Sequence, residues 1–88
     1  MALGADERVA DLTLREISRA AEAVLGRPVE LTSRTDIARD LAIDSLALMN
    51  IVMELEDKFD LSIPLDRMAV VETVGELASV VDELRTKR

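Results

Sequence analysis

The feature that most restricts the fold of this chain is the spacing of its apolar residues, which recur at helical intervals of three, four and seven positions. No segment shows the sustained period-two alternation of a half-buried β-strand. Only three glycines and two prolines interrupt the 88 residues, so long helices fit between few breaks. Aliphatic side chains must fill the core, because Phe59 is the only aromatic residue. The pattern predicts an all-α protein.

The first helix is expected to end at Leu25, because Gly26 and Pro28 close it in the usual order. The sequence leaves two alternative starts for this helix, Asp6 and Thr13, since a capping box fits at either position. Residues 27–44 then form a connection that is too long to be a purely polar loop without structure of its own in a compact domain. A short helical turn is expected within it, over residues 35–39. Five apolar residues of the connection are expected to tie it to the core: Val29, Leu31, Ile37, Leu41 and Ile43.

A second helix is predicted from Ser45 to Lys58 or Phe59. Asp44 and Ser45 are both suited to its N-terminus, because their side-chain oxygens accept hydrogen bonds from the first turn. Residues 61–64 should be extended, since a residue that precedes proline disfavours the helical conformation.

The last helix is predicted to begin near Thr73, where Thr73 and Glu76 fit a capping box. A short turn over residues 66–69 precedes it. The inner face of this helix is formed by apolar residues at helical spacing: Val74, Leu77, Ala78, Val81 and Leu84. The expected fold is a small four-helix bundle of three long helices and one short helix, with a long first loop, in a single domain of residues 1–88.

The chemical inventory argues against an enzyme. The chain has no histidine, cysteine, tryptophan or tyrosine. The usual neutral-pH base and the thiolate and imidazole ligands of metal sites are therefore missing. We expect no catalytic residue and no metal site. A formal net charge of −7 opposes nucleic-acid binding and favours partners with basic patches.

The N-terminal residues lack the basic start and apolar run of a signal peptide. No apolar stretch approaches the roughly 20 residues needed to span a bilayer. We therefore expect a cytoplasmic protein without a membrane span. We also expect a monomer.

The helix over residues 45–59 carries an apolar arc of roughly 220°, too wide for one core face. Glu56 falls inside this arc, and burying an unpaired carboxylate would be costly, so Glu56 should reach water. The core side of the arc holds Ile51, Val52, Leu55 and Phe59. The side that carries Ser45 holds a strip expected to be at least partly exposed: Leu46, Met49 and Met53. This strip either docks a partner or packs against the long connection.

Ser45 has two interpretations. A serine that precedes an apolar helix is most often only an N-cap. If its hydroxyl reacts, no histidine in the chain is available to activate it. A functional Ser45 must therefore be modified by another protein.

Residues 40–46, with the sequence Asp-Leu-Ala-Ile-Asp-Ser-Leu, resemble the phosphopantetheine attachment segment of bacterial acyl carrier proteins of the discrete type. Phe59 and the Ile-Pro pair that follows it stand at the same spacing from the serine as in that family. The resemblance implies a phosphopantetheinyl transferase that moves 4′-phosphopantetheine from coenzyme A onto Ser45, where acyl groups are carried as thioesters. It also implies that Asp44 helps to hold the transferase and its metal.

Several departures from the family pattern lie near Ser45. Ala42 stands where family members commonly have glycine, and Leu48 replaces a common polar residue. Uncharged Ala47 and Asn50 stand where carriers of fatty acid synthesis usually have acidic residues. The docking face is therefore less acidic and more apolar than usual, which favours a specialised lipid or polyketide pathway.

The face predicted to dock acyl-loading, condensing or acyltransferase enzymes combines the apolar strip with nearby acidic residues: Leu46, Met49, Met53, Glu54, Glu56 and Asp57. A carrier of general fatty acid synthesis is an alternative. An aminoacyl or peptidyl carrier is disfavoured, because such carriers usually have glycines before the serine. From a different class, the alternative is a helical interaction module without a prosthetic group.

Overall fold

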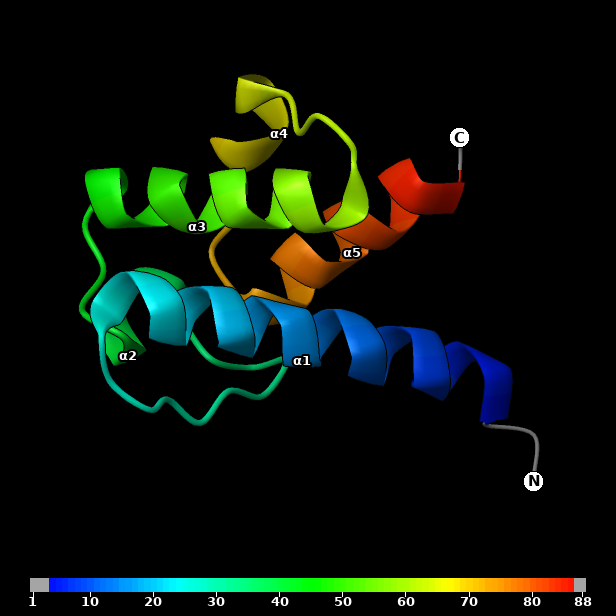
Figure 1. The fold of residues 1–88 in the computed structure, drawn as a ribbon, viewed down its shortest axis with the longest axis horizontal. Coiled ribbons are helices and arrows are strands. Elements are labelled where there is room, and N and C mark those ends of the chain that lie inside the picture. Colours follow the sequence, from blue (N-terminus) through cyan, green and yellow to red (C-terminus); the bar gives the residue numbers. More distant parts are fainter. Residues whose placement is uncertain (1–3, 87–88) are drawn as a thin grey trace.

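The computed structural model describes residues 4–86, and the burial of side chains from residue 12 onward. Three long helices form the body of the bundle: α1 (Gly4–Leu25), α3 (Ser45–Phe59) and α5 (Val74–Thr86). Two single-turn helices, α2 (Ile37–Asp40) and α4 (Leu65–Met68), lie in the connections between them. In Figure 1, α1 and α3 run antiparallel beside each other, and α1 also packs against α5. The predicted all-α helical bundle is confirmed, and residues 4–86 contain two short helices where one was expected.

The two short helices lie where the sequence predicted helical turns. Helix α2 begins after Asp36, whose Oδ1 accepts a hydrogen bond from the backbone N–H of Arg39 at 2.8 Å. The long first connection therefore contains a capped helix of its own. Helix α4 follows the extended Pro64, one residue earlier than the predicted turn.

Helix α1 begins at Gly4, upstream of both predicted starts, so the expected capping box at Thr13 is wrong. Thr13 is instead fully buried in mid-helix. Its hydroxyl donates a hydrogen bond to Asp82 and accepts one from Arg85 at 3.4 Å, both on α5. The C-terminal boundary was predicted correctly: Gly26 has φ 71°, a left-handed conformation that suits glycine. Although α1 is long, neither it nor another helix within residues 4–86 is apolar enough to cross a bilayer.

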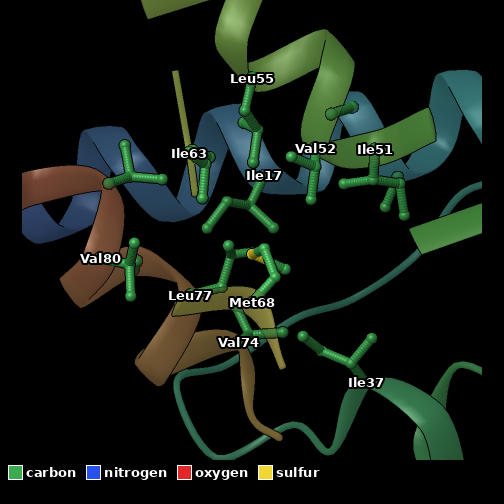
Figure 2. Packing of buried hydrophobic residues seen from close by; sticks show 14 of the residues in the cluster. Ile17, Ile37, Ile51, Val52, Leu55, Ile63, Met68, Val74, Leu77 and Val80 are labelled. Carbon is green, nitrogen blue, oxygen red and sulfur yellow. The ribbon is translucent and has the colours of Figure 1, made fainter. Parts of the chain in front are cut away.

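The core is one cluster of buried apolar side chains to which all five helices contribute. Figure 2 shows Ile17, Leu55 and Leu77 pointing toward one another from α1, α3 and α5. Three of the five predicted anchors of the long connection are buried in this cluster, namely Ile37, Leu41 and Ile43, and Val29 and Leu31 pack against it. Apolar burial is the main stabilising term for so small a domain, so these anchors fix the connection to the bundle.

Phe59 departs from its predicted core position. Ile51, Val52 and Leu55 are buried as expected, but Phe59 is half-buried at the edge of the cluster. The guanidinium carbon of Arg85 lies 4.5 Å from the centroid of the Phe59 ring. The last residue of α3 thus places one side of its ring against the core and the other against a cation, a favourable arrangement at a surface.

A backbone seam joins the long connection to the start of α5. Asp36 and Thr73 form an isolated antiparallel bridge in this seam. Three backbone hydrogen bonds of 2.9 Å complete it, from Ile37 to Glu72, from Val74 to Thr35 and from Gly75 to Ser33. The seam positions the segment that leads into α3.

The predicted capping box at the start of α5 is confirmed. The backbone N–H of Glu76 donates to Thr73 Oγ1 at 3.1 Å, and the Thr73 N–H donates to Glu76 Oε1 at 3.0 Å. The same Oε1 accepts a third bond, from the N–H of Glu72 at 2.7 Å. These backbone donors favour the charged carboxylate and lower the pKa of Glu76, the bond from Glu72 most of all.

The seam leaves no room for a side chain at Gly75. A Cβ atom there would lie 2.7 Å from the carbonyl oxygen of Ser33. We expect Gly75→Ala to lower the free energy of unfolding by about 1–3 kcal/mol, because the backbone must shift, although alanine favours helix. Urea unfolding measures the loss. The control is Ser79→Ala at an exposed position of α5, which should stay within about 0.5 kcal/mol of wild type. A Gly75→Ala protein as stable as wild type would contradict the close contact.

Candidate functional site

The N-terminus of α3 leaves the hydroxyl of Ser45 accessible. Asp44 is the N-cap, with extended φ and ψ of −85° and 178°, and its Oδ1 accepts a hydrogen bond from the Ala47 N–H at 2.8 Å. Ser45 is the first helical residue and is exposed. Within residues 4–86, its hydroxyl makes no hydrogen bond. Because Asp44 does the capping that the sequence left open between the two residues, the Ser45 oxygen is available to another molecule.

The segment before Ser45 is held from both sides. Leu41 and Ile43 are each only 7% exposed, whereas Ala42 and Asp44 between and after them face solvent. The guanidinium of Arg27 donates to the carbonyl oxygen of Leu41 at 3.2 Å, which ties the segment to the end of α1. The serine is thus presented from a fixed stretch of backbone.

Ala42 has a left-handed backbone with φ 54°. A side chain with a Cβ atom in this region costs roughly 1–2 kcal/mol, which glycine avoids. In the sequence, Ala42 stands at a position where glycine is common. The left-handed backbone at this position is the physical reason that glycine is favoured there. The alternation of buried and exposed residues around Ala42 keeps it in this conformation, because relaxing it would withdraw Leu41 or Ile43 from the core.

A hollow of about 240 Å³ opens beside Ser45. Apolar side chains form much of its lining and come from three separate parts of the chain: Ile37 and Ala38 of α2, Ile43 and Leu48 at the start of α3, and Val71 after α4. The carboxylates of Asp36, Asp44 and Glu72 also line it. Sequence reasoning missed this hollow, because no local pattern places Val71 opposite Leu48. The arrangement offers an accessible hydroxyl with an adjacent space for a small apolar group.

The comparisons agree with this geometry. Residues 15–81 match the family model described as the phosphopantetheine attachment site. The chain is 62% identical over 81 residues to the "Probable acyl carrier protein" of Caulobacter vibrioides, which covers 92% of this chain and 94% of that one. The chain belongs to the acyl carrier proteins.

Two further relatives support the family. The solution structure of a holo acyl carrier protein from Geobacter metallireducens superposes with a TM-score of 0.77, at 30% identity, over 85% of this carrier and 87% of that chain. The meromycolate extension acyl carrier protein of Mycobacterium tuberculosis is 35% identical over 69 residues, which cover 77% of this carrier but 60% of that protein.

Family membership defines the chemistry of this carrier. It is a carrier and not a catalyst, and it holds a covalently attached 4′-phosphopantetheine. Its working partners are therefore a transferase and acyl-handling enzymes. The residues at the start of α3 fit such a group, because the exposed Ser45 hydroxyl, which has no hydrogen-bond partner within residues 4–86, stands at a helix N-terminus. The partial positive charge there favours a phosphate. When bound, the group supplies a thiol that the cysteine-free chain lacks.

The apolar strip of the carrier is exposed as predicted. Leu46 is 71% exposed and Met53 is 60% exposed, while Met49 is half-buried. The long connection does not cover Leu46 or Met53, so the alternative that the strip packs against it is wrong for these two residues. Sequence reasoning missed two other exposed apolar side chains around α4, Leu65 and Val70.

The acidic residues of the predicted face differ in what they contact. Glu54 and Asp57 are exposed. Glu56 is half-buried, and its Oε2 accepts a hydrogen bond from the Ile63 N–H at 2.7 Å. Glu56 was expected to reach water, and it is instead half-buried, with this backbone donor pairing its carboxylate. Its carboxylate fixes the extended segment after α3 and is less available to a partner than those of Glu54 and Asp57.

The left-handed alanine before the serine gives a stability prediction. Ala42→Gly should raise the free energy of unfolding by about 1 kcal/mol, because the strain of the Cβ atom exceeds the extra freedom that glycine gives the unfolded chain. Urea unfolding measures the gain. The control is Ala38→Gly in α2, an exposed alanine for which no positive φ is recorded, and this change should lower stability. A loss of stability in Ala42→Gly would show that the left-handed conformation carries no strain.

Proposed function

We propose that Ser45 is the residue that carries the phosphopantetheine arm. The observation that supports this assignment is the division of roles at the helix N-terminus. Asp44 satisfies the first turn, and the exposed hydroxyl of Ser45 stays without a hydrogen-bond partner within residues 4–86. The mobile arm would then carry acyl intermediates as thioesters between enzymes.

Attachment at Ser45 is a phosphoryl transfer on a partner enzyme. The Ser45 oxygen attacks the β-phosphorus of coenzyme A, and a phosphodiester bond forms as the pyrophosphate bond breaks. The leaving group is 3′,5′-adenosine bisphosphate, and the serine proton passes to a base of the transferase. The chain has no histidine to act as that base.

Asp44 is suited to help in this step. Its Oδ1 is used in the cap, and its Oδ2 takes part in no hydrogen bond among the described residues. We propose that Oδ2 contacts the transferase and its metal during the encounter, since a carboxylate oxygen is a suitable ligand for a divalent cation. The metal then belongs to the enzyme and not to the carrier.

We propose that the carrier docks its enzymes through the α3 face beside Ser45, and that it serves a specialised lipid or polyketide pathway. The face combines Leu46, Met49 and Met53 with the carboxylates of Glu54 and Asp57. The uncharged Ala47 and Asn50 remove negative charge near the arm, where basic partners of general fatty acid synthesis would bind. Loading by general fatty acid enzymes as fast as by a dedicated enzyme would favour the alternative pathway.

We further propose that the carrier is a cytoplasmic monomer and that its 88 residues form one domain. The net charge of −7 supports a monomer, because like charge opposes self-association. Size-exclusion chromatography with light scattering measures the mass directly.

The attachment site is tested by intact mass. Incubation with coenzyme A and a promiscuous phosphopantetheinyl transferase should add about 340 Da to the wild-type chain. Ser45→Ala should abolish the addition, and Ser62→Ala, which changes another exposed serine, should not. Addition to the Ser45→Ala protein would place the arm elsewhere. Absence of addition in wild type, under conditions that modify a control carrier, would count against the carrier role.

The docking face is tested with Met53→Glu. Because Met53 is 60% exposed, the variant should unfold at the same urea concentration as wild type. Its rate of acylation by a cognate loading enzyme should fall about tenfold, which corresponds to about 1.4 kcal/mol of lost docking free energy. Ser79→Glu adds the same charge on exposed α5 and should keep the wild-type rate. Equal rates in the two variants would remove Met53 from the docking face.

A further inference from the structure

Helix α4 is weakly fastened to the bundle. It has four residues, and its N-cap Pro64 provides no side-chain hydrogen bond. Met68 is its one buried side chain, and Figure 2 shows Met68 inserted near Leu77 and Val74. The side chains on either side of that anchor face solvent, since Leu65 is 68% exposed and Val70 is 74% exposed. A segment with so little burial should open locally more often than the core does.

One ion pair joins this short helix to α5. Arg67 Nη2 lies 2.7 Å from Glu83 Oε1, and Arg67 Nη1 lies 3.3 Å from Glu83 Oε2. Two parallel hydrogen bonds of this kind fix the orientation of both groups, which a single contact does not. The hydrogen bond to Glu83, and next its charge, raise the pKa of the Arg67 guanidinium above its ordinary value. The pair is partly exposed, at 35% and 41% of the two side chains, so its effect on global stability should be small.

The segment after α4 connects this pair to the hollow beside Ser45. The Val71 N–H donates to the Met68 carbonyl oxygen at 3.1 Å, which ties Val71 to the end of α4, and the Val71 side chain packs against the core. Val71 and Glu72 line the hollow together with Ile37 and Leu48. The far end of the segment is held in the seam by the bond from the Ile37 N–H to the Glu72 oxygen. The wall is therefore held at residue 72 by the seam, and at Val71 by its core contact and by the bond to the end of α4.

We propose that the Arg67–Glu83 pair is a clasp that holds α4 against α5 and so keeps the Val71 wall of the hollow in place. The clasp makes Arg67 a positioning residue for an apolar acyl group delivered to the hollow by the arm, a role that rests on the proposed attachment at Ser45. Opening the clasp loosens the wall without unfolding the bundle. A weak, exposed pair suits this role, because a change of a few-fold in the fraction of molecules that form the pair is enough to change the access of the acyl group to the hollow.

Amide hydrogen exchange on the unmodified protein tests the clasp itself. In Arg67→Gln, the amides of Met68, Ala69 and Val71 should exchange about threefold faster than in wild type, in line with the loss of one exposed pair. The amides of Leu55 and Val81 should be unchanged. The swap Arg67→Glu with Glu83→Arg should restore slow exchange. No local increase in Arg67→Gln, or an equal increase at all five amides, would overturn the clasp.

The control variant for these measurements is Arg15→Gln. Arg15 is exposed on α1 and forms no ion pair among the described residues. Arg15→Gln removes one positive charge, as Arg67→Gln does. It therefore distinguishes loss of the clasp from an effect of net charge. The amides of Arg15→Gln should exchange at the wild-type rates. Faster exchange of the Met68 and Val71 amides in this control would show that the effect comes from charge alone.

A second measurement tests the link to the acyl group. Holo protein is loaded with a hexanoyl or an acetyl thioester, and cleavage by hydroxylamine is timed. Arg67→Gln should speed cleavage of the hexanoyl thioester about threefold and the swap should restore it, while the acetyl thioester, with little apolar surface to bury, should not respond. Equal hexanoyl rates in wild type and Arg67→Gln would overturn the link. Failure of the wild type to accept the arm at Ser45 would instead refute the proposed function and leave the exchange result standing.

Discussion

The docking of the long connection onto the start of α5 is the constraint on which the rest of this structure depends. Residues 33–37 exchange backbone hydrogen bonds with residues 72–75, and the absence of a side chain at Gly75 lets the two strands of backbone approach. Each such bond adds only about 1 kcal/mol to stability. The buried side chains of Ile37, Leu41 and Ile43 add much more. Together they turn a connection that local sequence leaves irregular into a fixed support for the N-terminus of α3.

That support explains how the chain presents an accessible serine. The backbone reaches α3 through a left-handed alanine between two buried residues, and the strain there is held by the burial on either side. Asp44 then caps the helix, and the exposed hydroxyl of Ser45 makes no hydrogen bond within residues 4–86. The proposed attachment at Ser45 needs accessibility and not activation, because in that proposal the transferase brings the base and the metal.

The surface around Ser45 has two parts, one on α3 and one on the side of α4, and they differ in what their side chains contact. On α3, exposed leucine and methionine lie beside exposed carboxylates, and this combination suits partners that bury apolar area and also carry basic groups. Glu56 lies among them in sequence but holds the backbone of Ile63. On the side of α4, a partly exposed ion pair and one buried methionine hold the wall of the hollow. The same short chain therefore combines a fixed backbone before Ser45 with a lightly held α4.

The sequence by itself determined where the helices lie apart from the start of α1, most of the buried faces of α3 and α5, the capping box of Thr73 and Glu76, and the resemblance that marks Ser45. Each of these depends on residues close together in the chain. Tertiary structure decided what depends on distant residues. Thr13 resembles a helix start but pairs with Asp82 across the bundle. Phe59 has core character but lies at the edge against Arg85. The hollow beside Ser45 exists only where Leu48, Ile37 and Val71 converge, since packing brings side chains together by their shape and position in space and not by their spacing in the sequence.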